Sequence, residues 1–204
     1  MMLKTYLLHL FHPKDSWVLM KQRGKRNWLY GLLLLLAAVL VRLAALFAGS
    51  YLFGGDKENV HILLEAAKLL VPTVSLAVAC YAMTSIMSGE VKFRELFTAF
   101  CYALLPYVLL TLPITLLSWC LTLEESGLYT LLNMLMWLWV FLLGFGAVKQ
   151  LNDYELRKTV LVLILSVLAM LLLWITLVLV AIFCIQWFQF FAGVLEEVRL
   201  MTLR

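Results

Sequence analysis

Residues 159–195, TVLVLILSVLAMLLLWITLVLVAIFCIQWFQFFAGVL, decide the fold class, because none of these 37 side chains is charged. Four other long runs contain at most one charged residue, namely 27–55, 69–89, 96–123 and 126–148. A bilayer core about 30 Å thick is crossed by about 20 apolar residues in an α-helix. The five runs therefore predict a membrane protein that crosses the bilayer several times.

Composition supports this class. Hydrophobic residues make up 65% of the chain and charged residues 14%, against roughly half and a quarter in soluble domains. Backbone groups in lipid must be hydrogen-bonded within the protein, and the runs lack the alternation of β-barrel strands. We predict an all-α, polytopic integral membrane protein with five transmembrane helices and a short N-terminal amphipathic helix. The expected spans are 28–52, 66–88, 95–119, 127–148 and 159–189.

The domain organisation has three parts: an N-terminal segment at 1–26, a five-helix transmembrane domain at 27–190 and a short tail at 191–204. In the N-terminal segment, apolar residues at helical spacing form one face, made of Leu3, Tyr6, Leu7, Leu10 and Phe11. A basic cluster follows, consisting of Lys14, Lys21, Arg23, Lys25 and Arg26. We expect a helix that lies on the cytoplasmic membrane surface and contacts anionic headgroups. Recruitment of a protein partner is the alternative.

Loop charges predict the orientation. Eleven Lys and Arg residues fall before the first span or in the loops on that side of the membrane, and three fall on the other side. This count leaves out Arg42 and Lys68, which lie in or near spans. The positive-inside rule then places the N-terminus in the cytoplasm and the C-terminus outside it.

Arg42 lies inside the first span, and an ionisable residue at such a position is a functional hypothesis by default. Glu65 and Lys68 lie at the entry of the second span. Because the two spans form an antiparallel hairpin, Arg42 and Glu65 approach each other if the arginine extends outward. We interpret this candidate intramembrane polar cluster as a structural pair. A contact with a substrate or ion, or an arginine that simply reaches the interface, are the alternatives.

Two prolines, Pro106 and Pro113, lie seven residues apart and share one face of the third span. Each removes a backbone hydrogen bond and should bend the helix. Shaped packing is the favoured interpretation, and a broken helix that lines a transport site is the alternative.

The last helix is expected to begin at Asn152 and Glu155, which have the spacing of a capping box. Its apolar run is longer than one span needs, yet it has no central Gly, Pro or Asn. We therefore predict a single long helix, tilted or protruding.

Motifs for catalysis are missing from the sequence, including H-E-x-x-H, G-x-S-x-G and the Walker loop. The three aspartates all fall in expected loops or tails. We expect no enzymatic activity, no cofactor, no metal site and no nucleic-acid partner.

Three blocks resemble the Yip family, membrane proteins named for interaction with Ypt/Rab GTPases. They are HPKDSWVLMKQ at 12–22, FRELFTAFCYALLPYVLL at 93–110 and LWVFLLGFGAVKQLNDYELRKTVLVLIL at 138–165. The second block is similar to the family's Ala-x-x-Tyr-x-x-x-Pro span, with Tyr102 and Pro106 at the motif positions. The third is similar to the family's glycine-containing fourth span and the polar hinge that follows it.

The resemblance implies a membrane organiser or partner-binding scaffold without catalysis. The chain lacks the Asp-Leu-Tyr-Gly-Pro motif of eukaryotic relatives and is more similar to short bacterial members, so GTPase binding is not inferred. The resemblance assigns no functional role to an individual residue. It implies a bacterial cell membrane, with the lipid bilayer and either a membrane protein or a second copy as partners. An accessory subunit of an ABC-type transport complex and a small transporter or channel are the alternatives.

Overall fold

In this computed structural model, the described backbone covers residues 26–49, 61–89 and 91–202, with the side chains of 28–49, 61–89, 91–122 and 124–193. The expected amphipathic face, Leu3 to Phe11, and the basic residues Lys21, Arg23 and Lys25 lie outside this part of the chain. Arg26 is the first residue of α3, and its side chain is also outside it.

The described residues form helices and no strands, as the sequence predicts. The elements are α3 (Arg26–Ala48), α4 (Ile62–Ile86), α5 (Phe93–Ala103), α6 (Leu105–Leu117), the short 3₁₀ helix η1 (Leu123–Glu125), α7 (Ser126–Leu151) and α8 (Leu156–Thr202). Five helices, counting α5 and α6 as one, are long and apolar enough to cross a membrane. The prediction of five spans is confirmed.

The second span begins earlier than the expected residue 66. Helix α4 starts at Ile62 and includes Glu65 in its first turn. A carboxylate is favourable there because the N-terminus of a helix carries a partial positive charge. The charged Glu65 therefore ends the apolar run, but the helix itself begins three residues earlier.

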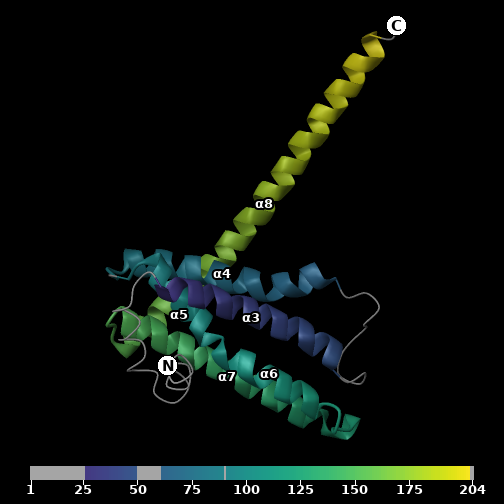
Figure 1. The fold of residues 1–204 in the computed structure, drawn as a ribbon. Helices are drawn as coiled ribbons and strands as arrows, with labels where there is room; N and C mark the ends of the chain where they lie inside the picture. Colours follow the sequence, from purple (N-terminus) through teal and green to yellow (C-terminus); the bar gives the residue numbers. More distant parts are fainter. Residues whose placement is uncertain (1–25, 50–60, 90, 203–204) are drawn as a thin grey trace.

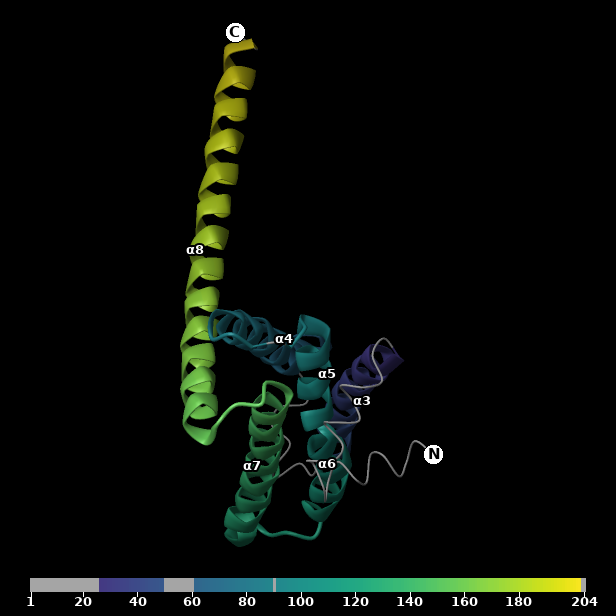
Figure 2. The ribbon, with the colours of Figure 1, turned by 90° about the vertical axis from the view of Figure 1, so that its left-hand side faces the viewer.

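The third span, α5 followed by α6, is the most buried of the five. It contacts α3 and α7 along both halves, and α5 also contacts α4 (Figures 1 and 2). The span is interrupted at Leu104, two residues before Pro106. Proline has no N–H to donate to the carbonyl four residues earlier. The bend expected from Pro106 is thus present as a break between α5 and α6.

The two prolines differ in environment, although they share a face. Pro106 is fully buried, whereas Pro113 is exposed within α6. Neighbouring helices cover the first turn of α6 more completely than its outer turns. Only Pro106 therefore lies in the core, although both prolines share one face of the span.

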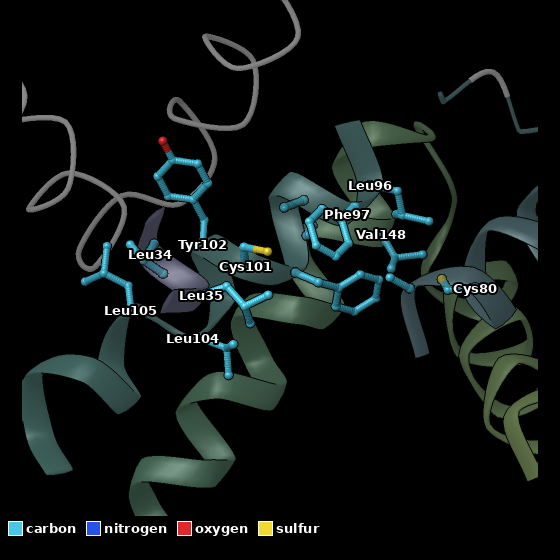
Figure 3. Packing of buried hydrophobic residues seen from close by; sticks show 14 of the residues in the cluster. Leu34, Leu35, Cys80, Leu96, Phe97, Cys101, Tyr102, Leu104, Leu105 and Val148 are labelled. Carbon is cyan, nitrogen blue, oxygen red and sulfur yellow. The ribbon is translucent and has the colours of Figure 1, made fainter. Parts of the chain in front are cut away.

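Helix α3 packs closely on α5 at Gly31. A Cβ atom at Gly31 would lie 3.2 Å from Thr98 Cγ2 and 3.3 Å from Thr98 Cα. Leu34 and Leu35 of α3 lie in the same buried cluster as Cys101 of α5 (Figure 3). Small residues that allow close backbone approach are typical of helix contacts in membranes, and this contact fixes α3 against the centre of the bundle.

Helix α8 is one continuous helix of 47 residues, as the sequence predicts. Among its side chains up to residue 193, the buried ones are Thr159, Val162 and Ser166, and they lie in the first third of the helix, where α8 packs on α4. The rest of the helix leaves the bundle steeply and stands clear of the other helices in both views (Figures 1 and 2).

The capping box expected at the start of α8 is not formed. Asn152 is instead the C-cap of α7, and its Nδ2 donates to Val148 O at 3.0 Å. A side-chain amide can hydrogen-bond to the unpaired backbone groups at either end of a helix. Here the Asn152 amide donates to a carbonyl at the end of α7. This part of the sequence prediction is wrong.

Candidate functional site

Three charged residues come together where α3 ends and α4 begins. The Glu65 carboxylate accepts hydrogen bonds from Arg42, with Nη2 at 3.1 Å and Nε at 3.3 Å from Oε2. Its second oxygen, Oε1, accepts from Lys68 Nζ, one helical turn further along α4. Arg42 is near the end of α3 and Glu65 is in the first turn of α4, so the antiparallel hairpin places them opposite each other. The approach expected from the sequence is present.

The charges of this group do not cancel. Two cations share one carboxylate, which leaves a net charge of +1. The Glu65 side chain is 14% exposed, while those of Arg42 and Lys68 are 40% and 66% exposed. The carboxylate is therefore enclosed, and both cations keep contact with the surroundings.

A fourth polar residue, Tyr107 of α6, lies beside Arg42. Its side chain is 2% exposed, and its ring packs against Trp137 with centroids 5.3 Å apart. Among the described residues, no group meets hydrogen-bond geometry with the Tyr107 hydroxyl. The hydroxyl nevertheless lies close enough to the Arg42 side chain to interact with it. We refer to Arg42, Glu65, Lys68 and Tyr107 as the polar cluster.

The sequence patterns did not predict that Tyr107 lies beside Arg42. A tyrosine next to Pro106 in a charge-free run was the available signal, because its hydroxyl needs a partner if it is buried. Which helix supplies that partner depends on how α6 faces α3, and an apolar run does not indicate this.

A further contact ties α3 to the chain after α6 near the polar cluster. Trp119 Nε1 donates to Ala48 O, the backbone carbonyl of the last α3 residue, at 2.7 Å. The carbonyls in the last turn of a helix lack intrahelical partners, and the indole satisfies one of them. This bond holds the end of α3 and the chain after α6 together, six residues beyond Arg42 along α3.

A second polar group lies at the opposite end of the bundle, where α4 ends and the α7–α8 hinge begins. The Tyr154 hydroxyl donates to carbonyl oxygens at the end of α4, with Met87 O at 3.3 Å and Thr84 O at 3.4 Å. Lys158 Nζ lies 4.2 Å from the centroid of the Tyr154 ring. Burial raises the pKa of Tyr154, so its hydroxyl keeps the donor proton at neutral pH.

Gly89 is enclosed by this group. A Cβ atom at Gly89 would lie 2.5 Å from Asn152 Oδ1, 2.7 Å from Tyr154 Oη and 2.9 Å from Thr84 O. We call Thr84, Met87, Gly89, Asn152 and Tyr154 the Tyr154 junction. It joins the end of α4 to the hinge, and the sequence analysis did not identify it.

The backbone at both sides of the Tyr154 junction turns sharply. Ser88 has φ 61° and Asp153 has φ 51°, the left-handed region that non-glycine residues rarely adopt. These two turns lie in the loop after α4 and in the α7–α8 hinge, the two segments that meet at the Tyr154 junction.

The residues of the expected motif lie in the core. Ala99 and Tyr102 of α5 and Pro106 of α6 are all buried, on either side of the break at Leu104. Tyr102 lies in the buried cluster with Cys101 and Leu105 (Figure 3). These positions therefore shape the central helix, and they do not join the polar cluster.

Comparison with known families agrees with this architecture. The model of the Yip1 domain matches residues 8–178, a range that contains the polar cluster, the break at Leu104 and the Tyr154 junction. The chain belongs to the Yip1 family. The resemblance seen in the three sequence blocks is confirmed. The match ends within α8, so the last part of that helix lies beyond the Yip1 domain. No curated protein and no solved structure matches the chain.

Proposed function

We propose that this Yip1-family protein is a membrane organiser, a scaffold that binds another membrane protein or a second copy of itself and does no catalysis. The observation that supports this function is the unpacked length of α8. Its apolar part, Leu156–Gly193, has 38 residues and would measure about 57 Å, roughly twice the thickness of the bilayer core. Such a helix leaves a long apolar side surface that a partner could cover.

Site-specific photo-crosslinking tests this function. With a photoreactive phenylalanine at Leu172 or Leu179 of α8, which are 64% and 61% exposed, irradiated membranes should give a protein adduct of defined mass. The same group at Leu33 of α3, which is 65% exposed, is the matched control and should react with lipid alone. Lipid adducts alone at all three positions would contradict the scaffold. A transport ATPase as the adduct would support the accessory-subunit alternative.

We further propose that the protein lies in a bacterial cell membrane with its N-terminus in the cytoplasm and its C-terminus outside. The N-terminal segment, with Leu3, Leu7, Leu10 and Phe11 on one face, would then rest on anionic lipid of the cytoplasmic leaflet. The charge distribution of the loops supports this orientation.

Cysteine labelling tests the orientation in a variant without native cysteines. An impermeant maleimide should label Glu124→Cys, in η1, in intact cells. It should label Glu155→Cys, in the α7–α8 hinge, only after permeabilisation. Both carboxylates are exposed in the structure, so access depends on the side of the membrane. The reverse pattern would contradict the orientation, and a residue-204 cysteine that labels like Glu155→Cys would contradict the fifth crossing.

A further inference from the structure

The polar cluster has more hydrogen-bond donors than its single carboxylate can accept. A guanidinium has five N–H donors and an ammonium three. Glu65 accepts from Arg42 through Nε and Nη2 and from Lys68 through Nζ. The Tyr107 hydroxyl, buried and without a described partner, lies on the α6 side of Arg42. The cluster therefore presents unused donors and a net positive charge together.

The start of α4 adds to this positive potential. Glu65 lies in the first turn of α4, where unpaired backbone N–H groups favour a negative charge. His61, the N-cap, makes no side-chain cap hydrogen bond. The first turn thus contributes to the attraction of an anion beside the two cations.

The surface around the polar cluster is apolar. Leu64 and Val71 lie at i−4 and i+3 from Lys68, on the same face of α4, and they are 58% and 51% exposed. A ligand that fits both features has an anionic head and hydrocarbon chains. Arg42 lies in the second-last turn of α3 and Lys68 in the second turn of α4, so in a bilayer both long side chains would reach toward the headgroups.

We propose that the polar cluster binds the phosphate of an anionic phospholipid between α3 and α4. Arg42 and Lys68 contact the phosphate oxygens, the buried Tyr107 supports Arg42 from the α6 side, and the acyl chains lie along Leu64 and Val71. Glu65 holds the two cations in place and prevents the repulsion that they would otherwise exert on each other. This ligand is independent of the partner proposed for α8.

Thermal unfolding of the purified, delipidated full chain in detergent tests the site. Phosphatidylglycerol should raise the melting temperature in a saturable way, because a ligand that binds the folded state stabilises it. Phosphatidylcholine, whose phosphate is paired with a choline cation, should raise it less at the same concentration. A parallel measurement with inorganic phosphate distinguishes a lipid headgroup from a free phosphate ion as the ligand. If it matches phosphatidylglycerol, the ligand is the free anion and the lipid assignment is overturned.

Two variants test the residues. Lys68→Gln removes an exposed cation and should weaken the apparent affinity for phosphatidylglycerol about tenfold, as expected for a lost hydrogen bond to a charged group. Tyr107→Phe keeps the buried ring and removes only the hydroxyl beside Arg42, so it should fold and weaken the affinity less. Lys149→Gln, at the cytoplasmic end of α7 in the proposed orientation, is the matched control and should bind as the wild type does.

Native mass spectrometry gives a second readout that does not depend on unfolding. The wild type should retain one phosphatidylglycerol per chain at a collision energy that strips it from Lys68→Gln. Equal retention by the wild type and both variants would overturn the proposal, as would equal stabilisation by phosphatidylglycerol and phosphatidylcholine.

Discussion

Glu65→Ala is expected to destabilise the protein by about 2 kcal/mol, because it breaks two partly exposed ion pairs at once and leaves Arg42 beside Lys68 without their shared carboxylate. Arg42→Ala should cost less, about 1 kcal/mol, since Lys68 still pairs with Glu65 and the Arg42 side chain is 40% exposed, which weakens the pair. The order of the two losses follows from the geometry, in which one carboxylate serves both cations.

The double variant Arg42→Ala/Glu65→Ala should be more stable than the sum of the two single losses predicts. Removing both members leaves Lys68, which is 66% exposed and needs no partner. The measurement is thermal unfolding in detergent for the two single variants and the double variant, combined as a double-mutant cycle. Arg157→Ala, an exposed arginine in α8, is the control and should be near neutral.

Additive losses in this cycle would show that Arg42 and Glu65 act independently and would contradict the pair. Unchanged stability together with an altered ion flux in vesicles would instead favour the transporter alternative.

Gly89→Ala is expected to cost about 2–3 kcal/mol, the upper part of the range for overpacked sites. The new methyl group would meet the Thr84 carbonyl oxygen at 2.9 Å, and a backbone atom inside α4 cannot rotate away. Tyr154 Oη and Asn152 Oδ1 lie closer still, so their side chains would have to leave the Tyr154 junction. The α7–α8 hinge would then lose its contact with α4.

Gly146→Ala is the matched control, because nothing lies within 4 Å of a Cβ atom at that position. Alanine is favoured over glycine inside a helix by up to about 1 kcal/mol, so this variant should be neutral or more stable. Thermal unfolding and limited proteolysis at the hinge measure the difference. If Gly89→Ala and Gly146→Ala unfold alike and the hinge resists protease in both, the Tyr154 junction does not hold α4 to the hinge.

Sequence patterns predicted part of the polar cluster and did not predict the Tyr154 junction. The Arg42–Glu65 contact followed from chain connectivity, because two adjacent spans must run antiparallel and the residues lie near the shared end. Tyr107 belongs to a span that is distant along the chain, so its position beside Arg42 did not follow. Asn152 can cap either the C-terminus of one helix or the N-terminus of the next. The sequence did not show that it caps the end of α7 and not the start of α8.

The sequence by itself determined the fold class, the five helices and the long α8. Transfer of an apolar run into lipid depends on that run alone, so length and charge predict it. Only the tertiary structure decided which faces meet: Gly31 on Thr98, Tyr107 beside Arg42, and α8 packed on α4 through its first turns alone. The physical reason is that these helices are apolar on most sides. No face is marked as inward, and the rotation of each helix is set by close packing and by the few polar groups that find partners.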